Sequence, residues 1–134
     1  MTKSTDRSDL VALRDLVREF VRERDWEKFH TPKNLAIALS VEASELLEPF
    51  QWLVSGDRLE LGEARMTAVR HEMADVLVYL LSLADKLNVD LFQAVQEKMD
   101  INRAKYPAEK VRGDARKYSE YKEEQDETTV RRPL

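Results

Sequence analysis

The sequence of 134 residues contains no cysteine, which excludes disulfide bonds, thiolate metal sites and cysteine nucleophiles. It has only three glycines and four prolines, whereas 36% of its residues are charged. This composition is typical of long amphipathic helices and lacks the turn residues that a β-sheet protein needs. No apolar run approaches the ~20 residues of a membrane span, and the first residues lack the apolar core of a signal peptide. We therefore expect a cytoplasmic, all-α protein with no membrane partner.

Acidic and basic residues are interspersed along the chain, and the formal net charge is -4. A field of this sign does not attract a nucleic acid polymer, so any phosphate-binding site must be local. The chain is long enough to form one domain with its own hydrophobic core. Residues 121–134 carry few apolar side chains, so we expect one domain over residues 1–120 followed by a disordered tail.

Apolar residues at helical spacing predict four long helices, over about 10–24, 31–54, 65–87 and 91–106. Thr31 and Pro32 mark the start of the second helix, because threonine caps free N–H groups and proline at the first turn loses no hydrogen bond. Pro49 predicts a kink in that helix or an early end near Glu48. The weakly patterned segment 58–64 has room for a short helix. Short connections favour antiparallel neighbours, so we expect a four- to five-helix bundle.

Four acidic side chains interrupt the apolar faces of the second and third helices. Glu42 and Glu45 are one turn apart in the second helix, and Glu72 and Asp75 repeat that spacing in the third. An ionised carboxylate in an apolar site takes up a proton or finds a partner, so four acids together favour a cation. Ligands that are all carboxylates suit Mg²⁺, with Mn²⁺ as a substitute. Alternatively, the acids form salt bridges with bases such as Arg70 or line a solvated groove.

Polar residues also lie on the core-facing side of the fourth predicted helix. Lys98, Asn102 and Tyr106 recur at i, i+4 and i+8, with Arg103 adjacent. Basic and amide side chains bind phosphate oxygens, so this face favours a phosphate pocket. A solvated helix end is the alternative for the same residues.

Aromatic residues near these motifs have two interpretations each. Trp26 and Phe29 occupy a segment without clean periodicity, where they either plug the end of the bundle or contact a ligand. Tyr79 lies one turn beyond Asp75 and is either a core tyrosine or a ligand contact. Both interpretations stay open at this point.

Together these motifs resemble the MazG-like all-α nucleotide pyrophosphohydrolases, and more specifically their dCTP pyrophosphatase branch. The resemblance covers about residues 10 to 120, and its most specific part is the run 98–103 combined with Phe50-Gln51-Trp52. The matching stretches are Glu42-Ala43-Ser44-Glu45, Glu72-Met73-Ala74-Asp75, Arg24-Asp25-Trp26, Phe29-His30, Pro32-Lys33-Asn34-Leu35, Phe50-Gln51-Trp52, Asp75 to Leu80, Lys98 to Arg103 and Tyr106-Pro107-Ala108.

The resemblance implies hydrolysis of a (deoxy)nucleoside triphosphate, with dCTP or a modified dCTP as the substrate, to the monophosphate and pyrophosphate. Such a reaction sanitises the nucleotide pool. Mg²⁺ would be held by Glu42, Glu45, Glu72 and Asp75, and we assign the general base to Glu45. The implied assembly is a homotetramer, a dimer of dimers with sites between chains. The implied substrate contacts are Trp26, His30, Asn34, Trp52 and Tyr79 for the nucleoside, and Lys98, Asn102, Arg103 and Tyr106 for the phosphates or sugar.

Two departures from the family pattern bear on this interpretation. The family signature often begins with two consecutive glutamates, whereas Val41 precedes Glu42 here, which leaves the number of metal ions open. Some relatives carry a histidine where Val17 stands, which leaves the base preference open. A dUTPase-like activity is therefore an alternative within the enzyme class. A helical protein-interaction module without catalysis is the alternative outside it.

Overall fold

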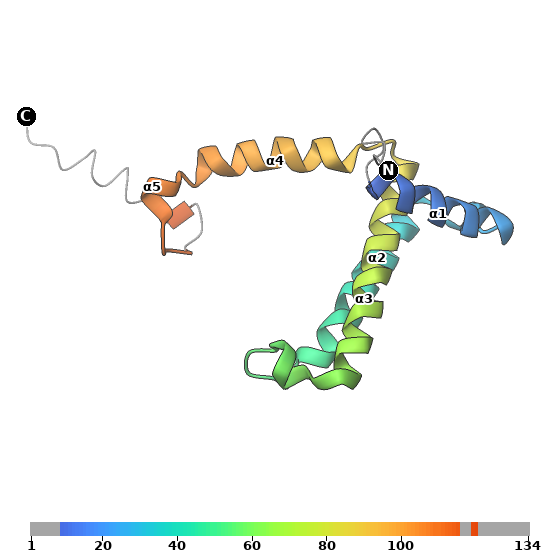
Figure 1. The fold of residues 1–134 in the computed structure, drawn as a ribbon. Helices are drawn as coiled ribbons and strands as arrows, with labels where there is room; N and C mark the ends of the chain where they lie inside the picture. The colour runs from blue at the N-terminus through green and yellow to red at the C-terminus, as the bar shows by residue number, and fades with distance from the viewer. Residues whose placement is uncertain (1–8, 116–118, 121–134) are drawn as a thin grey trace, which may run out of the picture. The chain divides into compact units, whose positions relative to one another are not determined.

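The computed structural model describes residues 9–115 and 119–120, and within these ranges the chain is helical and has no strand. The predicted all-α class is confirmed. No helix in these ranges is long and apolar enough to cross a membrane. The α-helices are α1 (Asp9–Glu23), α2 (Pro32–Leu47), α3 (Arg58–Lys86), α4 (Leu91–Lys105) and α5 (Ala108–Val111) (Figure 1).

Two short 3₁₀ helices flank α2, namely η1 (Glu27–Phe29) and η2 (Glu48–Phe50). The chain divides into two compact units, one ending at Leu91 and the other beginning at Phe92. The predicted disordered tail over residues 121–134 lies outside the described residues, and the predicted domain boundary stays a prediction.

The start of α2 follows the predicted capping pattern. The Thr31 hydroxyl oxygen accepts a hydrogen bond from the backbone N–H of Asn34 at 3.2 Å, and Pro32 occupies the first turn. The side-chain amide of Asn34 in turn donates to the carbonyl of Phe29 at 3.1 Å. These two bonds tie η1 to the beginning of α2.

Pro49 ends α2 early, which is one of the two outcomes predicted for it. The helix stops at Leu47, and Pro49 lies in η2. A proline further inside the helix would lose a backbone hydrogen bond, and its ring would clash with the carbonyl four residues before it. The second helix therefore stops short of the expected end near Val54.

The third helix starts earlier than predicted because a short helical turn precedes its long part. Asp57 caps the start, accepting the backbone N–H of Glu60 at 2.9 Å. Gly62 then breaks the helix with φ 70° and ψ 171°, a conformation that residues with a side chain rarely adopt. The segment 58–64 thus holds the short helix for which the sequence has room.

Glu60 fixes the connection between α2 and α3. Its carboxylate accepts the backbone N–H groups of Val54, Ser55 and Gly56 at 2.7 to 3.0 Å, and the Ser55 hydroxyl at 2.9 Å. These hydrogen bonds favour the ionised form and lower the pKa of Glu60 to about 2. The connection therefore depends on one carboxylate.

Replacing Glu60 with alanine is expected to loosen this connection, since three backbone N–H groups lose their acceptor. Hydrogen exchange at Val54, Ser55 and Gly56 should become faster, and the melting temperature should fall. The folded-state pKa lies below the ordinary value of 4.5, so this stabilisation is present above about pH 4.5 and is lost as the pH falls toward 2. Unchanged exchange at all three amides would contradict this role.

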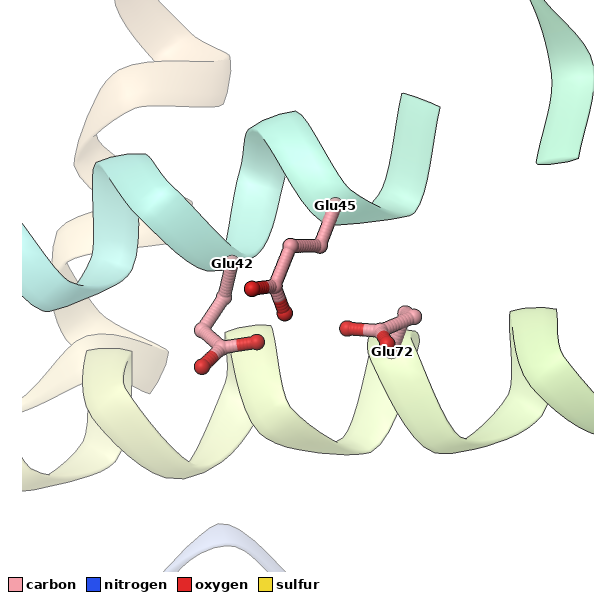
Figure 2. Close-up of side chains that lie close together, drawn as sticks. All are labelled: Glu42, Glu45 and Glu72. Carbon is pink, nitrogen blue, oxygen red and sulfur yellow. The ribbon is translucent and has the colours of Figure 1, made fainter. Parts of the chain in front are cut away.

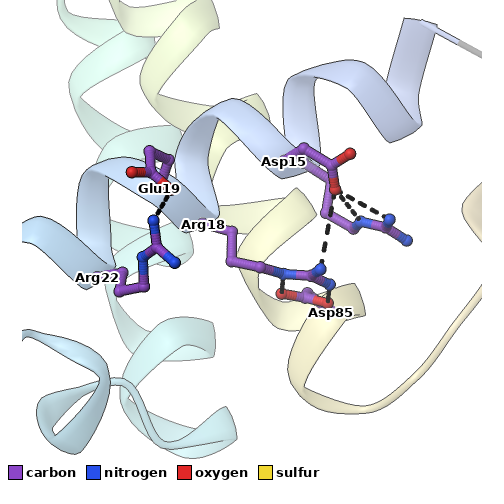
Figure 3. A network of polar contacts seen from close by, with 6 residues as sticks. Asp15, Arg18, Glu19, Arg22 and Asp85 are labelled. Atoms are coloured by element: carbon purple, nitrogen blue, oxygen red, sulfur yellow. Dashed lines mark hydrogen bonds and ion pairs between the residues drawn. The ribbon is translucent and has the colours of Figure 1, made fainter.

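Helices α2 and α3 run antiparallel and pack against each other, and α1 also packs against α3 (Figure 1). Arg18 of α1 forms a bidentate ion pair with Asp85 near the end of α3, with the Arg18 Nε atom 3.1 Å from Asp85 Oδ2 (Figure 3). The pair lowers the pKa of Asp85 and raises that of Arg18. Antiparallel packing of the two long helices, as predicted, places the acidic residues of one opposite those of the other.

The unit that ends at Leu91 leaves much of its apolar surface exposed. Leu16 of α1 is 68% exposed, Ile37 of α2 53% and Met73 of α3 57%. Exposed apolar side chains that gather into a patch are typical of contact with another protein chain. Within the described ranges, the buried apolar residues are Val21, Leu35, Leu61, Val69, Leu81 and Ala84.

Candidate functional site

Three of the four acids predicted as metal ligands meet between α2 and α3. Glu42 and Glu45 extend from α2 toward α3, and Glu72 faces them from α3 (Figure 2). One carboxylate oxygen from each side chain lies within 4.8 Å of the other two. Spacing of one turn explains why both α2 acids lie on the same side of their helix. We call Glu42, Glu45 and Glu72 the acid cluster.

Two oxygens of the acid cluster are buried and have no hydrogen-bond partner in the part of the chain that the structure describes. They are Oε2 of Glu42 and Oε2 of Glu72. In the described part of the chain, Arg70 is exposed and forms no salt bridge with these acids, although such a bridge was the alternative interpretation of their inward position. A buried carboxylate oxygen without a partner is costly, so the cluster favours a bound cation.

The acids of the cluster repel one another. The pKa of Glu42 is raised from 4.5 to about 7, first because burial disfavours its charged form. Contact with the Glu45 carboxylate is the next cause, followed by the charges of Asp75 and Glu72. A divalent cation between the carboxylates would relieve this repulsion.

Asp75, the fourth predicted ligand, stands beside the acid cluster. It lies one turn after Glu72 on α3 and is exposed, and its charge contributes to the raised pKa of Glu42. Its carboxylate is not part of the group of oxygens within 4.8 Å. Asp75 is therefore close enough to affect the cluster, and its role as a ligand stays a prediction.

The tryptophans predicted to contact the nucleoside lie at opposite ends of α2. Trp26 precedes the helix and Trp52 follows it, and its 16 residues span about 24 Å. Trp26 packs edge-on against Phe20 with a centroid distance of 5.8 Å, whereas Trp52 is 87% exposed. Within one chain, therefore, the two tryptophans do not meet.

Asn34 and Tyr79, two further predicted nucleoside contacts, lie on the paired helices. The amide of Asn34 is bonded to the Phe29 carbonyl, a structural role that helix periodicity does not reveal. Tyr79 is half-buried on α3, four residues after Asp75 and on the same side of the helix. Their contact with a nucleoside stays a prediction.

The predicted phosphate contacts belong to the second compact unit. Lys98, Asn102 and Arg103 lie on α4, and Tyr106 follows it and donates its backbone N–H to the Asn102 carbonyl at 2.8 Å. Arg103 forms an ion pair with Asp100 at 2.9 Å, and both side chains are exposed. The contact of these residues with phosphate stays a prediction.

Two pockets lie along α3, on either side of the acid cluster. The first has a volume of about 260 Å³ and lies between α1, His30 and the C-terminal part of α3. The Arg18–Asp85 ion pair forms part of its wall, and Val17 lines it as well. Sequence patterns did not predict this pocket, because it depends on how α1 packs on α3.

The second pocket has a volume of about 370 Å³ and shares Glu45 and Glu72 with the acid cluster. It extends from the cluster toward the N-terminal part of α3 and the start of η2. Its other lining residues are Glu48, Pro49, Ala64, Arg65 and Ala68. The acid cluster thus borders an open space large enough for a small ligand group.

Comparison with known proteins gives consistent results. Residues 37–121, which include the acid cluster, match the MazG-like family. The sequence is 48% identical over 110 residues to dCTP pyrophosphatase 1 of Homo sapiens and 47% identical over 111 residues to that of Mus musculus. Both alignments cover 81% of this chain, which spans 65% of the length of these relatives. A crystal structure of a pyrophosphatase from Archaeoglobus fulgidus is similar, with a TM-score of 0.70 and 45% identity over 79% of this chain and 99% of that one.

Proposed function

This chain belongs to the MazG-like family, and we propose that it hydrolyses a nucleoside triphosphate to the monophosphate and pyrophosphate. The observation that carries the proposal is the acid cluster, with its two buried and unpartnered carboxylate oxygens between α2 and α3. The similar proteins named as pyrophosphatases support the reaction class. Two of them are named dCTP pyrophosphatase 1, which supports dCTP or a modified dCTP as the substrate.

Mg²⁺ fits the acid cluster because every donor is a carboxylate oxygen, and Mn²⁺ can substitute for it. Glu42, Glu45 and Glu72 would hold the ion, with Asp75 beside them. When bound, the ion would neutralise phosphate charge and lower the pKa of a water molecule. The unpartnered oxygens of Glu42 and Glu72 support this assignment.

We assign the general base to Glu45. Its carboxylate lies between those of Glu42 and Glu72 (Figure 2), and an ionised carboxylate in that position can take a proton from an attacking water. The water oxygen forms a bond to the α-phosphorus while the bond to the bridging oxygen breaks, so pyrophosphate leaves. The products are the nucleoside monophosphate and pyrophosphate.

A second copy of the chain completes the nucleoside site in this proposal. Trp26 and Trp52 are separated by the length of α2, so both can contact one nucleotide only if they come from different chains. The exposed apolar side chains of Leu16, Ile37 and Met73 support contact between copies. The homotetramer implied by the family resemblance provides such contacts, and a cytoplasmic location would supply the nucleotides.

A screen of pyrophosphate release across canonical and modified nucleoside triphosphates tests the reaction. With Mg²⁺ present, we expect dCTP or a modified dCTP to give the highest kcat/KM, and a chelator to abolish release. No release from any triphosphate would overturn the proposal, whereas a preference for dUTP would keep the reaction and replace the substrate.

Thermal stability distinguishes the enzyme from a helical interaction module. A metal-dependent enzyme gains stability from Mg²⁺ and gains more when a non-hydrolysable nucleotide is added. A module whose acids only form a charged surface should show neither gain.

A further inference from the structure

An arginine that has no ion-pair partner within residues 9–115 and 119–120 lines the second pocket. Arg65 of α3 borders this pocket together with the acids Glu45, Glu48 and Glu72. Among the described residues, none forms an ion pair or a side-chain hydrogen bond with Arg65. Its guanidinium donors are therefore available to a ligand.

The helical repeat places Arg65 on the same face of α3 as the acid cluster. Arg65 and Glu72 are seven residues apart, close to two full turns, so they are separated by about 10 Å along the helix axis. Their shared presence in the lining of the second pocket agrees with this register. A ligand group in that pocket can therefore be close to both side chains.

The two pockets lie toward opposite ends of α3, so together they indicate how a bound nucleotide could lie along this helix. The first pocket, with His30 and Ser82, lies toward the C-terminal part of α3, and the second lies toward its N-terminal part. The acid cluster stands between them. A nucleotide with its nucleoside on the His30 side and its α-phosphorus at the acid cluster extends its outer phosphates toward Arg65.

We propose that Arg65 binds the β- and γ-phosphates of the triphosphate, and hence the pyrophosphate that leaves. This inference rests on the proposed function and adds a residue that none of the sequence motifs contains. Guanidinium groups suit phosphate because their planar N–H donors can form two parallel hydrogen bonds with it. The competing role is neutralisation of Glu45, Glu48 and Glu72 without substrate contact.

Inhibition by pyrophosphate and by the nucleoside monophosphate distinguishes phosphate binding by Arg65 from neutralisation of the neighbouring acids. In Arg65→Ala, we expect the KM for the preferred triphosphate to rise roughly 10- to 100-fold, the range for losing hydrogen bonds to a charged group. Inhibition by pyrophosphate should weaken by a similar factor, while inhibition by the nucleoside monophosphate stays unchanged. Arg65→Lys should recover part of the loss because it keeps the charge but not the fork of donors.

Arg70→Ala is the matched control, since Arg70 is an exposed arginine of the same helix that lines neither pocket. It should leave KM and both inhibition constants unchanged. Equal weakening of pyrophosphate and monophosphate inhibition by Arg65→Ala, or no change in either, would overturn the inference.

Calorimetry supplies a measurement that does not depend on turnover. Binding of magnesium pyrophosphate to the full-length protein should weaken roughly 10-fold or more in Arg65→Ala, while binding of Mg²⁺ alone should not weaken. Loss of Mg²⁺ binding in this variant would overturn the inference, because it would show that Arg65 supports the metal site of the acid cluster and does not bind the outer phosphates. If the wild-type protein releases no pyrophosphate, the proposed function itself is contradicted. If the wild type is active and Arg65→Ala has the same KM and the same inhibition by pyrophosphate, only this inference is contradicted.

Discussion

Glu72→Gln and Glu42→Gln are each expected to lower turnover by a factor on the order of 100 or more, because each removes a charge from the proposed cation site. Both side chains contribute a buried oxygen that accepts no hydrogen bond from a described residue. A neutral amide there cannot hold a divalent cation as a carboxylate does. Pyrophosphate release and calorimetric Mg²⁺ binding measure the two effects, and the helical circular dichroism spectrum should be unchanged.

The same substitutions should act in the opposite direction on the stability of the metal-free protein. Removing one negative charge relieves the repulsion that raises the pKa of Glu42, so the melting temperature near pH 8 should rise. Glu63→Gln is the matched control, because Glu63 is an exposed acid of α3 outside the acid cluster. Retained activity in both cluster variants would remove Glu42 and Glu72 from the metal site.

Local patterns in the sequence were sufficient to predict the helix boundaries that depend on a single residue. Thr31 caps α2 and Pro49 ends it, and both effects act within one turn of the residue that causes them. The meeting of Glu42 and Glu72 was also predictable. Spacing of one turn within α2 and a short connection to α3 are enough to bring the acids face to face.

Other features depend on contacts that helical periodicity does not encode. The hydrogen bonds from Val54, Ser55 and Gly56 to Glu60 require a particular loop conformation. The pocket beside Asp85 requires the packing of α1 on α3. Both were therefore missed, although a glutamate three residues after the Asp57 cap is a common signal of a helix start.

The separation of Trp26 and Trp52 shows that patterns within one sequence do not predict how residues from different copies of the chain combine. Both residues belong to stretches that resemble the family, and neither stretch indicates that they lie beyond opposite ends of α2, a helix about 24 Å long. Sequence motifs predict which side chains contact a substrate, but they do not indicate from which copy of the chain each side chain comes. The proposed assembly, with sites between chains, would account for this separation.

The metal-free protein is expected to be more stable at pH 5 than at pH 8, and Mg²⁺ should reverse that order. The folded-state pKa of Glu42 is about 7, against 4.5 as its ordinary value, so between these values the folded protein keeps a proton that the unfolded chain has lost. Stability therefore falls as the pH rises through this window, and above pH 7 the loss is at most about 3 kcal/mol, because solvent screens part of the repulsion between the carboxylates. For a chain of this length, the corresponding fall in melting temperature is at most roughly 10 °C.

In the proposed site, Mg²⁺ would reverse this order of stability because it would bind the ionised carboxylates and stabilise only the folded state. Melting curves at pH 5 and pH 8, with a chelator and with saturating Mg²⁺, measure both effects. The gain from Mg²⁺ should be large at pH 8 and small at pH 5, where the cation competes with the proton on Glu42. In Glu42→Gln, the fall in stability between pH 5 and pH 8 should be smaller by the contribution of that proton. An equal fall in the variant and the wild type would show that the pH dependence comes from other groups and that Glu42 is ionised in the metal-free protein throughout this range.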